Sequence, residues 1–333
     1  MKKITVTVCL KILILSLPLA AEEKIKFEGY ASSGMEYYDD EVYASCYYQG
    51  KLKVETTLDE NFKAVLDFRG RSETNEVELK GAYLRIKYSP WAHIKIGQIK
   101  KRFTLEEMSS EEDLPTIQVS LLNRHMDPFG FVVRGNGVSV YRDYEGDGVP
   151  VGYQAGVYYN ESHHIYGVAR FDRYSAGSFQ RFGLGGVYRE SIGSGDKSAM
   201  AFSLDGSWVF DRFSTEIESV WGQDPVESHY RQLQNRSDKA QFVGGRFLIT
   251  YKYPVERRFL TAWEPMALFC FLAPDTDQCE VHQIQCLVGL NIYLHKKVRI
   301  RINGDLILCN NSLDTSKYTM SGSGVMAEVQ TRW

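Results

Sequence analysis

The sequence lacks, beyond residue 21, any apolar run that approaches the ~18 residues a transmembrane helix requires. A helical membrane protein is therefore excluded. The net charge of the 333 residues is only -3 and the charged fraction, 24%, is ordinary, so nothing in the composition indicates a nucleic-acid partner. Tyrosine and phenylalanine are plentiful instead, at 21 and 17 residues, which favours strands over a helical bundle.

The first residues, MKKITVTVCLKILILSLPLAAEE, combine two lysines, an apolar run interrupted by Lys11, and small residues before Glu22. This is the pattern of a secretory signal peptide. We expect residues 1–21 to be the signal peptide and residues 22–333 to form the mature protein. A buried N-terminal strand is the alternative interpretation of the same run.

Cysteine is scarce, and no CxxC or Cys/His spacing indicates a zinc site. Cys9 lies in the expected signal peptide, so five cysteines remain in the mature chain. Because five is an odd number, at least one of them stays a thiol even if the others form disulfides. Cys270 and Cys279 flank the turn at residues 274–277 almost symmetrically. They are therefore candidates for a cross-strand disulfide, and the alternative is that both stay thiols.

Alternation of apolar and polar residues with a period of two recurs along the rest of the chain, in segments of about ten residues. In the segment at residues 62–72, for example, Lys63, Asp67 and Arg69 share one face. We predict about sixteen strands of this kind. They cover residues 25–36, 46–58, 62–72, 77–88, 93–100, 131–141, 151–159, 164–172, 179–189, 198–210, 213–222, 242–253, 261–272, 280–294, 298–309 and 322–333.

The connections between these strands alternate in length. Short turns fall at residues 59–61, 89–91, 211–212 and 295–296, and longer connections at residues 37–45, 102–130, 223–241 and 310–321. Short turns on one rim and long loops on the other are typical of a bacterial outer-membrane barrel. An even number of strands places both ends of the chain on the periplasmic, short-turn side of the barrel. Counting the strands from residue 25 then makes residues 102–130 the third external loop.

A soluble β-sandwich also alternates, with its charged face outward, so alternation alone does not say which face is inside. Three features favour a barrel: the signal peptide, the asymmetry of the connections, and an amphipathic last strand that ends on Trp333. Because lipid offers no partners to backbone amides, strands in a membrane must close on themselves. We therefore expect an all-β fold, a transmembrane antiparallel β-barrel with a water-filled lumen.

The predicted lumen face of the early strands is basic. Arg69, Arg71, Arg85, Lys87 and Lys95 fall on alternating positions of three successive strands, so we expect them to line one wall. Arginine presents a planar fork suited to phosphate or carboxylate, and a ladder of moderate sites lets an anion enter and leave. The alternative is that these charges only hydrate the lumen and pair with acids of the third loop.

The sequence IKIGQIK at residues 94–100, followed by FTLE at residues 103–106 and by Asp113-Leu114, resembles the phosphate-selective porin O/P family. Arg134 and the GVSV of residues 137–140 are similar to that family's next strand. The resemblance covers residues 80–145. It implies a trimeric porin of sixteen strands whose long third loop folds into the lumen. It also implies anion selectivity from basic residues at the constriction, here Lys95, Lys100, Lys101, Arg102 and Arg134.

The third loop departs from the family pattern in its acidic residues, which are Glu106, Glu107, Glu111, Glu112 and Asp113. Lys101 and Arg102 also stand where the family has a small residue or proline. Acids that fold inward would face the basic wall and create the transverse field of a general diffusion porin. Such a field orients polar solutes without selecting one anion, so a non-selective or cation-leaning pore is the alternative to an anion-preferring one.

The expected function is passive diffusion of small hydrophilic solutes, with anions or phosphate favoured, through a homotrimer in outer-membrane lipid. An enzyme would need a nucleophile and base, but the histidines are scattered and no GxSxG motif occurs. Residues 143–148 lack EF-hand spacing, so we expect neither a metal nor a cofactor. A structural or adhesive surface barrel is a further alternative, supported only by the loop at residues 223–241 and the surface cysteines.

Overall fold

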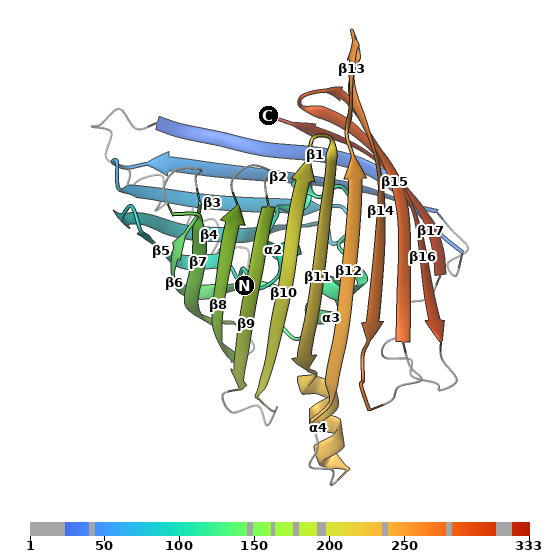
Figure 1. Cartoon of the computed structure of the whole chain (residues 1–333). Coiled ribbons are helices and arrows are strands. Elements are labelled where there is room, and N and C mark those ends of the chain that lie inside the picture. Colours follow the sequence, from blue (N-terminus) through green and yellow to red (C-terminus); the bar gives the residue numbers. More distant parts are fainter. Residues whose placement is uncertain are drawn as a thin grey trace.

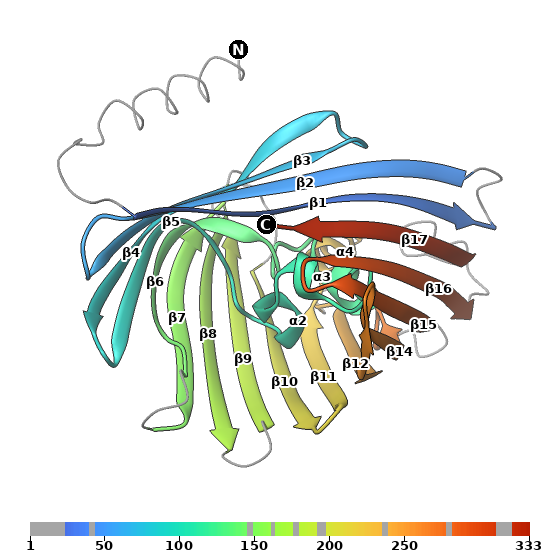
Figure 2. The same ribbon diagram turned by 90° about the horizontal axis from the view of Figure 1, so that it is seen from above.

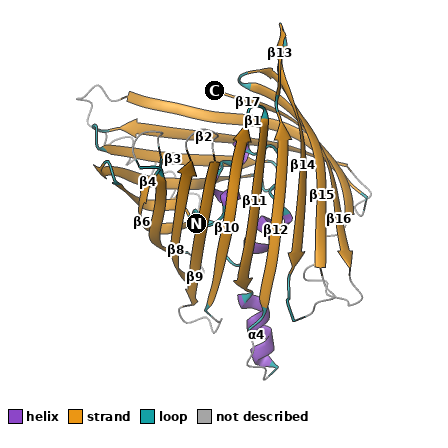
Figure 3. Cartoon of the chain, viewed as in Figure 1, coloured by secondary structure: helices purple, strands orange, loops and turns teal. Residues whose placement is uncertain are grey.

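A computed structural model describes residues 24–39, 44–144, 149–160, 164–175, 180–191, 198–234, 239–277, 282–310 and 322–333. The expected signal peptide and Cys279 lie outside the described residues. The described chain is almost entirely β-structure, wound into one sheet around a few short helices (Figures 1 and 3).

The strands follow one another around the sheet in chain order. They are β1 (Lys24–Tyr38), β2 (Ala44–Thr57), β3 (Phe62–Arg71), β4 (Glu76–Ser89), β5 (Ala92–Lys100), β6 (Arg134–Arg142), β7 (Val151–Tyr159), β8 (His164–Ser175), β9 (Gln180–Ser191), β10 (Ala199–Phe210), β11 (Phe213–Gln223), β12 (Gln241–Tyr251), β13 (Tyr253–Arg257), β14 (Leu260–Ala273), β15 (His282–His295), β16 (Val298–Asn310) and β17 (Gly322–Arg332).

The sheet closes because β1 pairs antiparallel with β17, from Tyr30 opposite Arg332 to Tyr38 opposite Gly324. Every other pairing is also antiparallel. The short β13 continues β12 after a break at Lys252 and pairs only with β14, so the two count as one strand of the barrel. The molecule is thus a closed antiparallel barrel of 16 strands, which confirms the predicted fold.

The polar face of each strand is the inner one. In β17, Met326, Glu328 and Gln330 are buried, whereas Val325 and Val329 are exposed on the outside. Exposed Tyr88, Trp91, Tyr253 and Trp333 mark the ends of strands on the side of the short turns. An apolar outer face bordered by aromatic residues suits a lipid bilayer and not water. The alternative of a soluble sandwich, with charges outward, is therefore wrong.

The third external loop folds inward, as predicted. We call residues 101–133 loop L3; it contains the helix α2 (Leu105–Met108), the 3-10 turn η1 (Glu111–Asp113) and the helix α3 (Leu121–Met126). Seen along the barrel, α2 and α3 lie inside the ring of strands (Figure 2). A further helix, α4 (Pro225–Leu233), lies in the connection from β11 to β12 and projects beyond the rim opposite β13 (Figure 1). None of the described helices is long and apolar enough to cross a membrane.

Gly97 shows how closely neighbouring strands approach where β5 leads into L3. Its φ of 130° favours glycine, and a Cβ there would lie 2.2 Å from the carbonyl oxygen of Ala82 on β4. Any side chain at this position would strain the backbone and push β4 away. Gly97, the glycine of the sequence IKIGQIK, therefore has a purely steric role.

We expect Gly97→Val to destabilise the barrel by about 2 kcal/mol or more, since left-handed strain alone costs 1–3 kcal/mol. Urea unfolding in lipid vesicles, followed by tryptophan fluorescence, measures the loss. The control is Gly167→Ala in β8, where a Cβ would meet nothing within 4 Å. Equal stability of the two variants would contradict the steric role of Gly97.

Candidate functional site

The lumen between L3 and strands β1–β6 contains two cavities. One, of about 890 Å³, lies towards the long connections and is lined by residues such as Glu36, Arg71 and Lys80. The other, of about 540 Å³, lies towards the short turns and is lined by Glu28, Lys53 and others. We call them the outer and inner cavity. A solute crossing the barrel on this side would pass through both.

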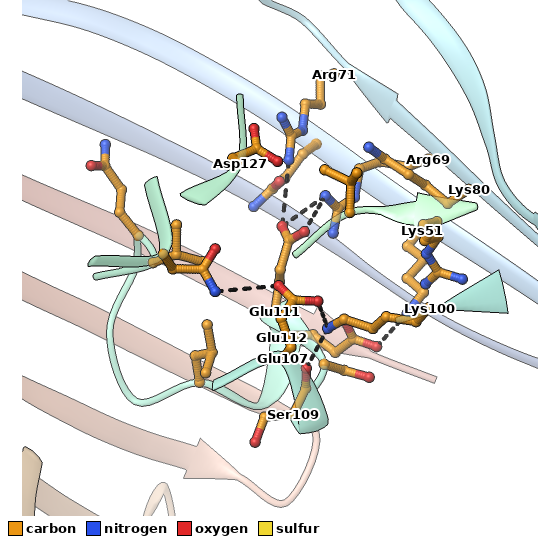
Figure 4. Close-up of a pocket in the computed structure, with 18 of the residues that line it drawn as sticks. Lys51, Arg69, Arg71, Lys80, Lys100, Glu107, Ser109, Glu111, Glu112 and Asp127 are labelled. Atoms are coloured by element: carbon orange, nitrogen blue, oxygen red, sulfur yellow. Dashed lines mark hydrogen bonds and ion pairs between the residues drawn. The ribbon is translucent and has the colours of Figure 1, made fainter. Parts of the chain in front are cut away.

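Eight residues line both cavities, and we call this ring the belt. Four come from the barrel wall and four from L3. They are Lys51, Asp67, Lys100 and Arg134, and Glu107, Ser109, Ser110 and Glu112. Because the two cavities meet here, the belt is the candidate constriction. Figure 4 shows Lys51 and Lys100 directed towards the acids of L3.

Each cation of the belt has a carboxylate partner. Lys51 Nζ lies 2.7 Å from Glu112 Oε1, and Lys100 Nζ lies 3.3 Å from Glu107 Oε2. Arg134 donates to Asp67 Oδ2 at 3.0 Å. Three cations thus face three carboxylates, and the ring carries charge of both signs without a large excess of either. Polar solutes crossing it would meet a transverse field rather than one cationic site.

Above the belt, the tip of L3 is held by the basic wall. Arg69 donates to Glu111 at 2.7 Å and Arg71 at 3.4 Å (Figure 4). Burial opposes the charge of Glu111, but Arg69 outweighs it and the pKa of Glu111 falls to about 2. The ion pair therefore persists as the pH falls through the usual carboxyl range, and is lost only near pH 2.

Glu107 has the opposite environment. Its side chain is buried, and burial raises the pKa of Glu107 above its usual 4.5, although Lys100 and a hydrogen bond from Asn123 favour the charged form. Glu107 therefore takes up a proton at a higher pH than an ordinary carboxyl does.

The extended part of L3 depends on side chains of the wall for its backbone hydrogen bonds. Arg301 on β16 donates to the carbonyl oxygens of Leu114 and Thr116, at 3.2 and 2.7 Å. The N–H of Ile117 donates to Asn303 Oδ1 at 2.8 Å, and a similar bond joins Leu121 to Gln285. Unpaired backbone groups inside a barrel would be costly, so these contacts determine where L3 lies.

Glu106, although acidic like its neighbours, secures L3 internally. It accepts hydrogen bonds from the backbone N–H and the hydroxyl of Ser120, at 2.9 and 2.6 Å. Its own N–H donates to Glu218 on β11, whose carboxylate pairs with Arg246 at 3.1 Å. This buried network links Glu106 and Ser120 of L3 to each other and to β11 on the far wall.

Apolar packing fills the half of the lumen behind L3. The residues involved are Phe103, Leu121, Leu122, Met126, Phe129, Phe131, Phe242, Leu268 and Leu272. Lys101 belongs to this buried half. It is fully buried, donates to the carbonyl of Gly130 and lies 3.6 Å above the ring of Tyr166, and burial lowers its pKa to about 7. The two cavities that meet at the belt therefore lie along β1–β6.

The predicted basic residues separate into three groups. Six line the cavities: Arg69, Arg71, Lys95, Lys100, Arg102 and Arg134. Arg85 pairs with Glu55 at 3.2 Å and Lys87 is exposed at the short-turn end, and neither lines these cavities. Lys101 is not a pore-lining residue, because it is enclosed behind L3. A pore-lining role of Arg85 and Lys87 therefore stays a prediction, whereas the enclosure of Lys101 does not fit such a role.

The predicted acids of L3 also divide. Glu107 and Glu112 belong to the belt, Glu111 binds Arg69, and Asp113 pairs with Arg332 at 2.7 Å. The sequence analysis missed Lys51, Asp67 and the two serines as members of the belt. Lys51 and Asp67 lie on the inward faces of alternating strands, which was the available signal, but alternation does not say how far along the barrel L3 sits.

Cys270 is buried on the inner face of β14, opposite Gln285. Its predicted disulfide with Cys279 stays a prediction, because Cys279 lies outside the described residues. Among the described residues, no group of three His, Cys, Asp or Glu side chains is placed to hold a metal ion.

No family model matches the sequence, and no curated protein matches it. Solved structures do. The anion-selective porin from Comamonas acidovorans aligns with a TM-score of 0.65 at 11% identity, over 94% of this chain and 100% of that one. The trimer form of in-vitro folded OmpT from Vibrio cholerae gives 0.64 at 8%, over 94% and 100%. Salmonella typhi OmpF in complex with daunomycin gives 0.61 at 12%, over 93% and 98%.

These similarities define the class of fold, which is that of the outer-membrane porins. Together with the apolar outer face, the fold places the protein in the bacterial outer membrane. The resemblance to the phosphate-selective porin O/P family is thus supported as far as porin architecture, and not for that particular family.

The raised pKa of Glu107 predicts a pH-dependent selectivity. Protonation of Glu107 leaves two charged carboxylates facing the three cations of the belt. On acidification the reversal potential in a KCl gradient should therefore shift towards the value of an anion-selective pore. The midpoint of the shift should lie above the pH at which an ordinary carboxyl titrates. Glu107→Gln should show the shifted value at every pH, and a variant that still titrates would argue against Glu107.

Proposed function

We propose that the protein is a passive porin for small hydrophilic solutes, with a weak preference for anions. The observation that supports this most directly is the belt, where charged side chains of both signs from the wall and from L3 border two consecutive cavities. Enzymatic activity is not part of the proposal, because the histidines and hydroxyls do not form a catalytic arrangement at the belt.

The anion preference comes from the inner cavity. Its lining includes seven cations, Lys51, Lys53, Lys95, Lys100, Arg102, Arg134 and Arg332, and five carboxylates, Glu28, Asp67, Glu107, Glu112 and Asp113. The difference, 7 − 5, is an excess of two positive charges in the inner cavity, whereas eight cations and nine carboxylates line the outer cavity, so the bias along the whole pathway is weak. Such an excess raises the local concentration of anions, and the effect weakens with salt.

Specific phosphate binding at the belt has less support. A phosphate site uses cations whose donors are free to converge on its oxygens. Here Lys51, Lys100 and Arg134 all have carboxylate partners within 3.3 Å. A phosphate would have to displace those partners, so we favour general diffusion with an anion bias over a phosphate-selective pore.

We also infer a homotrimer. One of the similar solved structures, OmpT, is described as a trimer form. The mass of the native complex in detergent tests this inference, and a monomer under conditions that preserve conductance would contradict it.

Planar-bilayer recordings test the proposal. A charge ~4 Å from a permeating ion in water contributes about 1 kcal/mol, so removing both lysines of the belt, about 2 kcal/mol together, should shift the permeability ratio about thirtyfold towards cations. The double variant is Lys51→Gln with Lys100→Gln. The opposite double variant, Glu107→Gln with Glu112→Gln, should shift the ratio towards anions.

Lys26→Gln is the matched control, since this exposed lysine lines neither cavity. Its selectivity should equal that of the unmodified protein. A folded protein that shows no conductance steps would overturn the porin proposal. If both double variants conduct with the permeability ratio of the unmodified protein, the porin proposal stands but the belt is not the constriction.

A further inference from the structure

A third cavity, of about 900 Å³, lies on the other side of L3 and is not part of the pathway described above. It opens towards the short turns between strands β10 and β17. It shares no lining residue with the outer cavity, and only Asp113 and Arg332 with the inner one. Asp113 and Arg332, which form an ion pair, therefore lie on the border between the third cavity and the inner one.

A small hollow of about 200 Å³ continues from the third cavity beneath L3, with Asp113, Ser214, Thr250, Glu264 and Tyr293 common to both. Leu114 and Pro115 of L3 and Leu248 on β12 give this hollow an apolar lining, and Ser109 of the belt lies on its border. The third cavity is therefore a side cavity of the barrel that a solute enters from the short-turn side.

The lining of the third cavity is strongly basic. Its cations are Arg212, Lys252, Lys296, Lys297, Arg299 and Arg332, and its carboxylates are Asp113, Asp211 and Glu264. Six cations against three carboxylates leave an excess of three, and His295 adds a further titratable group. Within the described part of the chain, Lys252, Lys296 and Lys297 have no carboxylate within 4.0 Å.

Among these cations, Arg299 gives the strongest indication of an anion site. Its side chain is only 5% exposed, lines the cavity, and has no carboxylate partner among the described residues. Nε donates to Gln330 Oε1 at 2.8 Å, and Nη2 donates to the carbonyl of Glu112, so both acceptors are neutral. A nearly buried guanidinium beside other cations is costly unless an anion compensates it.

The walls between the charges are partly apolar. They include Val209, Phe213, Ala262, Tyr293 and Val298. The volume lies within the range of pockets that hold small organic ligands. Glu264 already accepts hydrogen bonds from Tyr293 at 2.7 Å and from Asn291 at 3.1 Å, so it leaves the cations available to a ligand.

We propose that this pocket binds small organic anions with two or more acidic groups, which enter from the periplasmic side. One acidic group would lie at Arg299, and others at Lys252 and Lys297 near the mouth. A bound anion would also attract Arg332 and weaken its pair with Asp113, which belongs to L3. Binding in the third cavity would therefore affect the pore by changing a contact at the tip of L3.

Calorimetric titration of the folded protein in detergent with citrate tests the pocket without any need for conductance. We expect saturable binding at low ionic strength. Removing two cations in Lys252→Gln with Lys297→Gln should weaken binding at least about tenfold, as expected for the loss of charge-assisted contacts. Both lysines are exposed, so this variant should fold normally.

Arg299→Gln should weaken binding to a similar or greater extent, with folding checked by the mobility of unheated protein on gels. The matched control is Lys87→Gln, an exposed lysine on the same rim that does not line the pocket. No binding of citrate by the unmodified protein would overturn the proposal. Equal weakening by Lys87→Gln would also overturn it, because it would show only a general charge effect.

Single-channel recordings give a second test, which rests on the proposed porin function. Citrate should reduce conductance when added to one face of the bilayer and have little effect from the other. The Lys252/Lys297 variant should lose this asymmetry while keeping its basal conductance. Symmetric block would contradict the pocket but not the porin, whereas absence of any conductance would contradict the porin and leave the calorimetric result to decide the pocket.

Discussion

The position of L3 depends on hydrogen bonds from charged and amide side chains of the wall to its backbone. A segment without regular structure cannot satisfy its own N–H and C=O groups, and inside a barrel it needs partners from the strands. Arg301, Asn303 and Gln285 supply them for residues 114–121. Because these donors and acceptors lie on β15 and β16, L3 crosses to that wall, and open space is left along β1–β6.

This asymmetry gives the inner surface its functions. On the filled side, apolar residues and buried networks such as Glu106, Glu218 and Arg246 hold L3 as a rigid partition. On the open side, the same loop presents Glu107, Glu111 and Glu112 to a basic wall. Asp113 of L3 also borders the third cavity. The position of L3 therefore shapes both the pore and the third cavity.

The strands were predicted well because alternation is local and each segment carries it. The predicted strand boundaries were wrong where segments that are not strands show the same alternation of apolar and polar residues. Residues 131–133 alternate like the start of β6, but Phe131 and Val132 pack in the apolar cluster of L3, and β6 begins at Arg134. The chain at residues 242–253 was predicted as one strand, whereas β12 breaks at Lys252 and continues as β13. The helix α4, capped by Asp224, was predicted only as a loop.

The sequence by itself determined the barrel, the number of its strands to within the uncertainty of their ends, and the long third external loop. These follow from periodicity and from the lengths of connections, which are properties of neighbouring residues, whereas the inward folding of that loop was expected only from the resemblance to a porin family. Only the tertiary structure decided which charges face the pore. Lys101 and Lys100 are adjacent in sequence, yet one is enclosed against Tyr166 and the other lines the belt. The reason is that the surroundings of each side chain depend on where L3 meets distant strands, and contacts between residues nearly two hundred positions apart leave no local pattern.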